Sequence, residues 1–157
     1  MQTHQNPNKL LETARYIASN NDFNVAISEM ANAEVLSIDT EFLRERTYFP
    51  QLCLIQVASE RQAWCIDAIA VDDLSPFMQM CKSTAITKIL HSARQDMEIF
   101  CMQSDDVPMP IFDTQIAATF SGRADQISYA ALVEELFGVS LDKSQTRTNW
   151  VKRPLRE

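Results

Sequence analysis

Glycine is scarce in this chain of 157 residues, and that scarcity excludes several nucleotide-binding motifs. The only glycines are Gly122 and Gly138. A P-loop or a G-x-G-x-x-G turn needs glycines close together, because the backbone must approach phosphate without a Cβ in the way. Nucleotide binding of the kinase, GTPase or Rossmann kind is therefore excluded.

Three further absences narrow the class of protein. No apolar run approaches the roughly 20 residues of a membrane span, and the polar start has no apolar stretch behind it, so we expect neither a membrane segment nor a secretory signal. His4 and His91 are too few and too far apart for a histidine-rich metal site. No C-x-x-C motif occurs, so the cysteines read as buried reduced thiols in a cytoplasmic protein. They are Cys53, Cys65, Cys81 and Cys101.

The composition is that of one globular domain. Hydrophobic residues make up 46% and charged residues 22% of the chain, which is enough to form a sizeable core. The net charge of -7 argues against a general nucleic-acid binder. Residues 141–157, with five basic and two acidic side chains, nevertheless form a strip of net charge +3, and Arg44 and Arg46 form another. Such a strip can meet a phosphate backbone, but a solvated polar tail explains the charge equally well.

Hydrophobic periodicity predicts an α/β protein with no internal repeat. Strands are expected at 35–38, 52–58, 62–66, 86–90 and 111–112, and helices at 22–33, 74–81, 93–103, 114–120 and 129–137. The first three strands suggest an antiparallel meander, and the later alternation implies a mixed sheet flanked by helices. Residues 10–18 fit either a helix or a strand. The apolar stripe of 129–137 is the clearest in the chain, and we expect it, with Tyr129, to lie in the core.

The first candidate site is an acidic pair at the end of the strand at 35–38. Asp39 and Glu41 are two residues apart, so in a strand they share a face at roughly 6.5–7 Å along it. Two like charges beside an apolar run repel each other and lose hydration, and a divalent cation resolves that cost. Carboxylate oxygens suit Mg²⁺ or Mn²⁺. The alternative is a polar strand end that turns into solvent.

Asp96 adds a third carboxylate. On the helix expected at 93–103 it shares a face with Ala93, Ile99 and Phe100. A carboxylate on an apolar face needs a partner, although a solvated aspartate is the commoner case for any single helix position. We therefore expect Asp96 to converge with Asp39 and Glu41 in one acidic cleft.

Several segments together resemble the ribonuclease D family, within the DEDD (DnaQ-like) superfamily of 3′-5′ exonucleases. They read IDTEF at 38–42, RERTYFPQL at 44–52, LHSARQD at 90–96, FDTQ at 112–115, LDKS at 141–144, RTNW at 147–150 and RPL at 153–155. The resemblance implies a ribonuclease H-like fold whose first strand contains residues 16–18. It also implies an exoribonuclease that acts on RNA 3′ ends, such as those of tRNA precursors.

The resemblance further implies roles for individual residues. Asp39, Glu41 and Asp96 match three of four acidic residues that hold two Mg²⁺ or Mn²⁺ ions for phosphodiester hydrolysis. Asp39 would bridge both ions, Glu41 would serve one, and Asp96 would act at the other through water. The expected substrate-binding residues are Phe42, near the terminal nucleotide, Gln51, His91, Lys143 and Arg147.

Five of the matched residues also have structural interpretations. Asp113 is expected to cap the next helix, and His91 to form hydrogen bonds at a strand end rather than act as a base. Lys143, Arg147 and Arg153 either contact RNA or brace the carboxylate-rich cleft.

The sequence departs from the family pattern in its third motif, Y-x-x-x-D, which supplies the fourth carboxylate and a tyrosine. Tyr129 does not replace it, because Val133 stands four residues later, and Asn149 stands where the family often has aspartate. We therefore expect a polar leader at 1–15 and an incomplete exonuclease domain at 16–157, without the family's C-terminal helical domains and poorly active alone. A non-catalytic RNA-binding module, or a scaffold whose acidic pair is merely solvated, remains the alternative.

Overall fold

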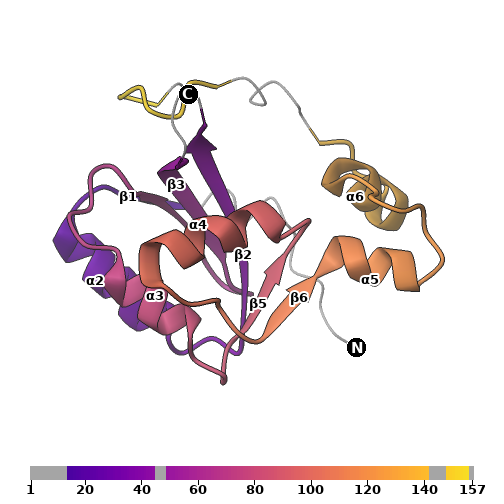
Figure 1. The fold of residues 1–157 in the computed structure, drawn as a ribbon, viewed down its shortest axis with the longest axis horizontal. Helices are drawn as coiled ribbons and strands as arrows, with labels where there is room; N and C mark the ends of the chain where they lie inside the picture. The colour runs from indigo at the N-terminus through magenta and orange to yellow at the C-terminus, as the bar shows by residue number, and fades with distance from the viewer. Residues whose placement is uncertain (1–13, 45–48, 142–147, 156–157) are drawn as a thin grey trace.

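The computed structural model describes residues 14–44, 49–141 and 148–155, and its strands form one mixed sheet (Figure 1). The strands are β1 (Arg15–Ile17), β2 (Val35–Leu43), β3 (Gln51–Ala58), β4 (Ala63–Asp67), β5 (Thr87–Leu90) and β6 (Ile111–Asp113). Their order is β1-β4-β3-β2-β5-β6. The β2-β3-β4 meander is antiparallel as predicted, whereas β1 joins β4, β5 joins β2 and β6 joins β5 in parallel. The predicted mixed sheet is therefore confirmed.

Strand β2 is longer than the sequence pattern predicted. The strand expected to end at residue 38 continues to Leu43, because the residues after it pair with β3. Asp39 pairs with Gln56, and Glu41 pairs with Leu54. Both carboxylates therefore lie inside the strand and not at its end. Backbone pairing, which does not depend on side-chain polarity, decides where the strand stops.

Three helices complete the main core. They are α2 (Asn20–Met30), α3 (Ser75–Cys81) and α4 (Arg94–Ser104), and α3 packs against both of the others. Inward side chains of the sheet meet fully buried aromatic residues of these helices in one hydrophobic cluster. The cluster includes Leu36, Ile38, Ile55 and Ile66 from the strands, and Phe23, Phe77 and Phe100 from the helices. Each such side chain contributes roughly 1.5–3 kcal/mol on burial, so this cluster fixes β2 and α4 relative to each other.

Lys88 is a fully buried cation within this core. Its Nζ donates hydrogen bonds to the backbone oxygens of Ser83, Ile86 and Met109, at 2.9, 2.7 and 2.6 Å. An ammonium group has three donors, so the arrangement satisfies all of them. Lys88 thereby ties β5 to the segments that precede β5 and β6.

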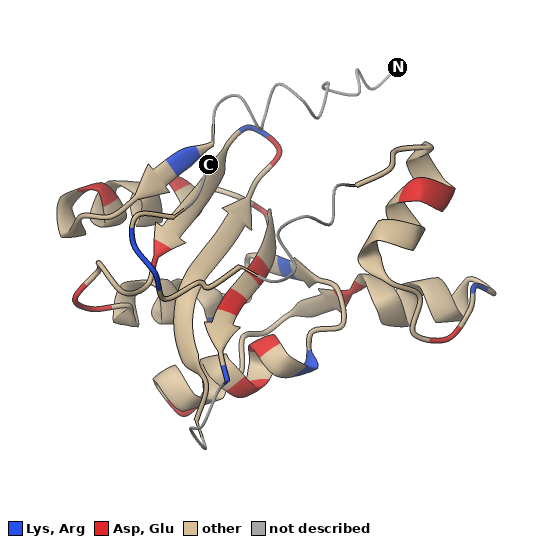
Figure 2. Cartoon of the chain, turned by 90° about the horizontal axis from the view of Figure 1, so that it is seen from above, with Lys and Arg blue, Asp and Glu red and all other residues tan. Residues whose placement is uncertain are grey.

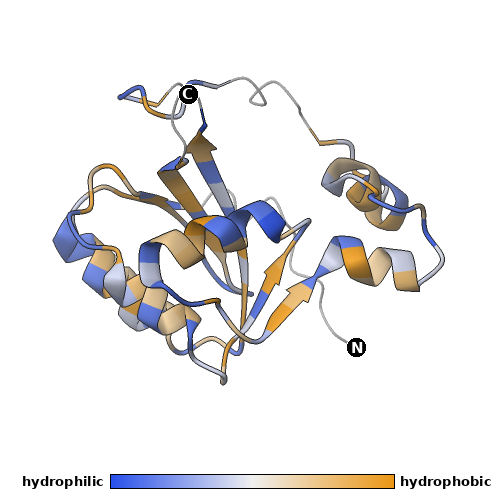
Figure 3. Ribbon diagram, in the orientation of Figure 1, coloured by the Kyte–Doolittle hydropathy of each residue, from blue (hydrophilic) through white to orange (hydrophobic). Residues whose placement is uncertain are grey.

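The last two helices, α5 (Thr114–Phe120) and α6 (Tyr129–Phe137), stand beside the sheet next to β6 (Figure 1). The expectation that the stripe of α6 lies in the core is wrong. Only Leu132 is buried on this helix, while Tyr129 is 57% and Phe137 72% exposed. A stripe is buried only where another element lies against it, and α6 stands away from the sheet. Figure 3 shows the apolar residues on this part of the chain.

Two further sequence predictions can be compared with the structure. All four cysteines are free thiols, but only Cys53 and Cys81 are buried, whereas Cys65 and Cys101 are half-buried. Across the described ranges, no helix is both long and apolar enough to cross a bilayer.

Candidate active site

The acidic pair lies on the central strand β2, whose alternation assigns its residues to two faces. Leu36, Ile38 and Thr40 are buried toward the helices. Asp39 and Glu41 are more accessible and occupy the opposite face, two residues apart. The same-face placement expected from the sequence is therefore present, in the middle of the sheet rather than at a strand end.

Asp96 approaches β2 from the first turn of α4 and is only 7% exposed. The Thr40 hydroxyl donates a hydrogen bond of 2.5 Å to Asp96 Oδ1. Burial raises the pKa of Asp96, although the Thr40 hydroxyl opposes the shift. The apolar-face position of Asp96 thus has the partner that its burial requires, and Thr40 is a residue that the sequence patterns did not single out.

Electrostatically, the three carboxylates form one cluster. Burial, followed by the charge of Asp96, raises the pKa of Asp39 to about 6. Burial, followed by Asp39 and then Asp96, raises the pKa of Glu41 to about 7. In the described part of the chain, no lysine or arginine forms an ion pair with any of the three. Figure 2 shows how acidic and basic residues are distributed over the elements.

The cluster is not a ready-made metal cage. Over residues 14–44, 49–141 and 148–155, no three His, Cys, Asp or Glu side chains are grouped so that they could hold one ion. Asp96 is hydrogen-bonded to Thr40, and the Thr40 side chain points to the face of β2 opposite Asp39 and Glu41. The donor set nevertheless fits a hard divalent cation, because it consists of carboxylate oxygens that no lysine or arginine of the described residues neutralises.

A β-bulge lies beside the acidic pair. Glu41 pairs with Leu54 and the next residue, Phe42, pairs with Leu52, which leaves Cys53 as an extra residue in β3. Bulges bend a strand, re-aim its side chains and are frequent next to active sites. No sequence pattern predicted this bulge, because it depends on how two strands pair.

The predicted substrate-binding residues fall in different places. Phe42 is half-buried and packs against the core, while Gln51 is exposed at the start of β3, paired with Leu43. Both border the bulge, and their roles toward RNA stay predictions. Lys143 and Arg147 lie outside the described residues.

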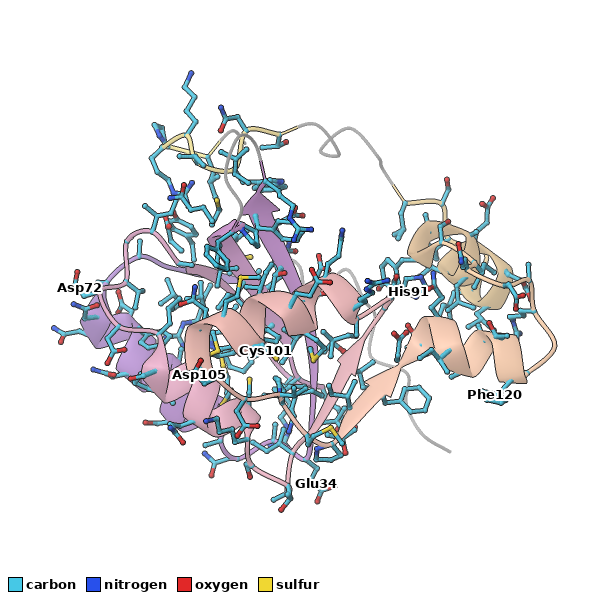
Figure 4. All side chains as sticks on the ribbon, viewed as in Figure 1. Glu34, Asp72, His91, Cys101, Asp105 and Phe120 are labelled. Carbon is cyan, nitrogen blue, oxygen red and sulfur yellow. The ribbon has the colours of Figure 1, made fainter. Side chains whose placement is uncertain are left out.

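His91 joins the end of β5 to the α5–α6 part of the chain (Figure 4). Its Nε2–H donates to the Ile127 carbonyl at 2.9 Å, and its Nδ1 shares a 2.9 Å hydrogen bond with the Thr114 hydroxyl. The Tyr129 ring meets the imidazole edge-on, with centroids 5.6 Å apart. Both ring nitrogens are thus engaged within the protein, as expected for a hydrogen-bonding residue at a strand end.

Asp113 caps the helix that follows it, which confirms that expectation. Its carboxylate accepts hydrogen bonds from the backbone N–H groups of Gln115 and Ile116 in α5. It also accepts from the N–H groups of Ser92 and Ala93, just before α4, at 3.0 and 2.9 Å. Burial alone would raise the pKa of Asp113, but these donors hold it below its ordinary value. One side chain therefore holds two helix starts.

A second charged cluster, centred on the buried Asp67, was missed in the sequence. Arg153 Nε and Nη2 contact the two Asp67 oxygens at 2.5 and 2.6 Å, and the Tyr16 hydroxyl donates to Asp67 Oδ2. Burial would raise the pKa of Asp67, but Arg153 and Tyr16 lower it to about 2. Arg153 therefore braces Asp67, not the three carboxylates expected to form the cleft. A pair 86 residues apart has no spacing signal.

Comparison with known proteins places the chain in a family. A family model described as a 3′-5′ exonuclease matches residues 14–157. The chain belongs to this 3′-5′ exonuclease family. The ribonuclease D of Bartonella henselae is 43% identical to this chain over 144 residues, which are 91% of this chain and 36% of the relative. That of Escherichia coli K12 is 44% identical over 122 residues, 78% of this chain and 32% of the relative. The chain therefore spans about a third of the length of these relatives.

Solved structures agree with this assignment. Escherichia coli RNase D, described as an exoribonuclease involved in structured RNA processing, matches this chain with a TM-score of 0.86 at 39% identity, over 90% of this chain and 38% of that one. A Trypanosoma brucei RNase D complex with RNA U12 shares the fold, with a TM-score of 0.82 at 16% identity, over 96% of this chain and 57% of that one. The predicted ribonuclease H-like α/β fold and the resemblance to ribonuclease D are confirmed.

Proposed function

We propose that this chain carries the metal-binding part of a 3′-5′ exoribonuclease of the ribonuclease D type, which shortens RNA from its 3′ end with two Mg²⁺ or Mn²⁺ ions. The observation that carries the proposal is the pair Asp39 and Glu41. It lies on one face of the central strand, its pKa values are raised to about 6 and about 7, and no cationic side chain in the described ranges pairs with it. A site built for a divalent cation has this uncompensated charge.

Each acidic residue has a distinct part in the proposal. Asp39 and Glu41 bind the ions directly through their carboxylates, and Asp96, held by Thr40, acts through water. When bound, divalent ions supply the Lewis acid and the activated water of a phosphodiester hydrolysis. The buried Thr40–Asp96 hydrogen bond fixes one carboxylate before substrate arrives, which reduces the reorganisation that the reaction requires.

RNA is the proposed substrate, with 3′ ends of tRNA precursors as the class that the ribonuclease D resemblance suggests. The half-buried ring of Phe42 and the exposed amide of Gln51 border the bulge beside Glu41, where a terminal nucleotide would lie. Lys143 and Arg147 are proposed phosphate contacts, and His91 a neighbour of the substrate. We further propose that residues 16–157 form the exonuclease domain, behind a polar leader at 1–15, in a cytoplasmic protein.

We expect the 157-residue chain alone to hydrolyse RNA weakly, because its sequence contains no Y-x-x-x-D motif to provide the fourth carboxylate and the orienting tyrosine. Each of these groups is typically worth about 100-fold or more in rate. The second candidate is a module that binds RNA without cleaving it.

Two measurements test the proposal. The first is Mn²⁺ binding, followed by calorimetry and by the loss of the free-ion paramagnetic resonance signal, for the wild-type chain and Asp39→Asn. We expect weak binding that Asp39→Asn abolishes, and equal binding by both proteins would refute the metal site.

The second measurement follows a 5′-labelled single-stranded RNA with Mn²⁺ or with chelator. Slow stepwise shortening that stops with chelator, with Asp39→Asn or with a 3′-blocked RNA supports the exonuclease. RNA binding without any shortening at high protein concentration favours the binding module.

A further inference from the structure

Arg153 uses every donor of its guanidinium within the protein. Nε and one Nη2 donor go to Asp67, and Nη1 donates to the backbone oxygens of Trp150 and Lys152, at 2.6 and 3.1 Å. The remaining Nη2 donor reaches the Cys53 backbone oxygen at 3.1 Å, across 100 residues of sequence. An arginine with five donors is thus saturated, and it holds three backbone oxygens as well as a buried carboxylate.

The contact with Cys53 falls on the bulge beside the acidic pair. Cys53 is the extra residue of β3, opposite the step from Glu41 to Phe42. Its carbonyl lies outside the regular ladder and accepts instead from the Ala68 backbone N–H, at 3.2 Å, and from Arg153. The conformation of the bulge, and with it the course of β2 at Glu41, therefore depends on groups that come from other parts of the chain.

The position of Asp67 reinforces this connection. Asp67 of β4 pairs with Leu54 of β3, and Leu54 in turn pairs with Glu41 of β2. Directly paired residues of antiparallel strands point to the same face, so Asp67 and Glu41 share a face with one strand between them. Arg153 bridges Asp67 and the Cys53 carbonyl and thereby fixes two of the three strands at this level.

We propose that Arg153 is a positioning residue for the metal-binding pair: by holding the Cys53 bulge and Asp67, it sets the direction in which Glu41 presents its carboxylate. The inference rests on the proposed function, since it concerns the same metal site. Metal binding requires donor placement to within about 0.5 Å, and a bulge that shifts between conformations does not provide that placement. Residues behind the ligands typically change metal affinity by about 10–100-fold when they are lost.

Lysine cannot reproduce the contacts of Arg153, so Arg153→Lys separates the effect of the charge from that of the donor geometry. A lysine retains the positive charge beside Asp67 but has three donors from one nitrogen, and it cannot form the two-point contact with the carboxylate and reach Cys53 as well. Arg153→Lys therefore preserves much of the ion pair while releasing the bulge. If the contacts of Arg153 served only stability, Arg153→Lys would lower the melting temperature and leave the metal affinity of the folded protein unchanged.

The experiment measures the Mn²⁺ dissociation constant of the 157-residue chain and the thermal melting of each protein in chelator. Arg123→Lys is the matched control, because Arg123 is 27% exposed, close to the 25% of Arg153, and pairs with Glu135 on α6, away from the bulge. We expect Arg153→Lys to weaken Mn²⁺ binding about tenfold, and Arg123→Lys to change it by less than about twofold. Tyr16→Phe, which removes one donor from Asp67 at a half-exposed position, is expected to weaken binding about threefold.

The outcomes separate the inference from the proposed function. Loss of Mn²⁺ binding in Asp39→Asn together with wild-type affinity in folded Arg153→Lys overturns the inference and leaves the proposed function standing. If Arg153→Lys does not fold, Tyr16→Phe decides, and wild-type affinity in that variant overturns the inference. Equal binding by wild type and Asp39→Asn refutes the metal site, and the positioning role with it.

Discussion

Replacing Glu41 by glutamine should stabilise the metal-free protein at high pH, although it removes a side chain of the proposed site. Burial, Asp39 and Asp96 all raise the pKa of Glu41, and no interaction that lowers it accompanies them. The folded state therefore holds the Glu41 proton up to a pH of about 7, whereas the unfolded chain releases it near 4.5. The folded state binds more protons across that window, so the free energy of unfolding falls as the pH rises through it.

The size of the effect follows from the two pKa values. The difference between 4.5 and about 7 corresponds to at most roughly 3 kcal/mol, at 1.36 kcal/mol per pH unit. Glu41 is partly exposed, so water screens the repulsion, and Asp39 shares it. We therefore expect Glu41→Gln to gain about 1 kcal/mol at pH 8 and nothing at pH 4.5. For a domain of this size, that gain raises the melting temperature by about 2–4 °C.

Urea unfolding in chelator at several pH values between 4.5 and 8 measures this difference. Glu134→Gln is the control, because Glu134 is an exposed glutamate on α6 and remote from the acidic pair. Parallel curves of stability against pH for the wild type and Glu41→Gln would refute the reasoning. Added Mn²⁺ should reverse the order of the two proteins, because only the wild type gains from binding the ion.

Three further substitutions test other contacts, each followed by chemical unfolding at pH 8. Thr40→Val removes the donor to buried Asp96 and should cost about 2 kcal/mol; an unchanged stability would show that the bond is not formed in solution. Asp113→Ala removes the acceptor of two helix starts and should cost about 2 kcal/mol, whereas a cost below about 0.5 kcal/mol, the usual range of surface substitutions, would contradict the double cap. Lys88→Met leaves three backbone oxygens without their donor and should cost about 3 kcal/mol, so an equally stable variant would contradict the structural role of Lys88.

The local elements could be predicted from the sequence because their signals are local. The strand expected at 52–58 is Gln51–Ala58, and the helix expected at 129–137 is Tyr129–Phe137. Alternation and helical spacing express how neighbouring residues share a face. Burial does not follow in the same way, as exposed Phe137 shows. The pattern of α6 describes the helix itself and carries no information on what packs against it.

The same distinction between local patterns and long-range contacts applies to the candidate site. The D-x-E spacing placed Asp39 and Glu41 on one face, and the apolar spacing of α4 indicated a buried Asp96. The other features depend on contacts between residues far apart in the sequence. Thr40 and Asp96 are 56 positions apart, Glu41 and the bulge residue Cys53 are 12 apart, and Asp67 and Arg153 are 86 apart. Such contacts are set by strand pairing and by the return of the chain across the sheet, and no short motif specifies them.

The double cap at Asp113 has a mechanical consequence. Helix α4 begins just after Ser92 and Ala93, whose N–H groups donate to Asp113 Oδ1 and Oδ2 respectively. In the first turn of α5, the N–H groups of Gln115 and Ile116 both donate to Oδ1. The starts of both helices are therefore held by one side chain, Asp113, and Asp96 lies in the first turn of α4. A force that displaces α5 either breaks these bonds or moves the start of α4 with it. The spacing between Asp96 and the acidic strand is thereby coupled to the placement of a helix that contains none of the three carboxylates.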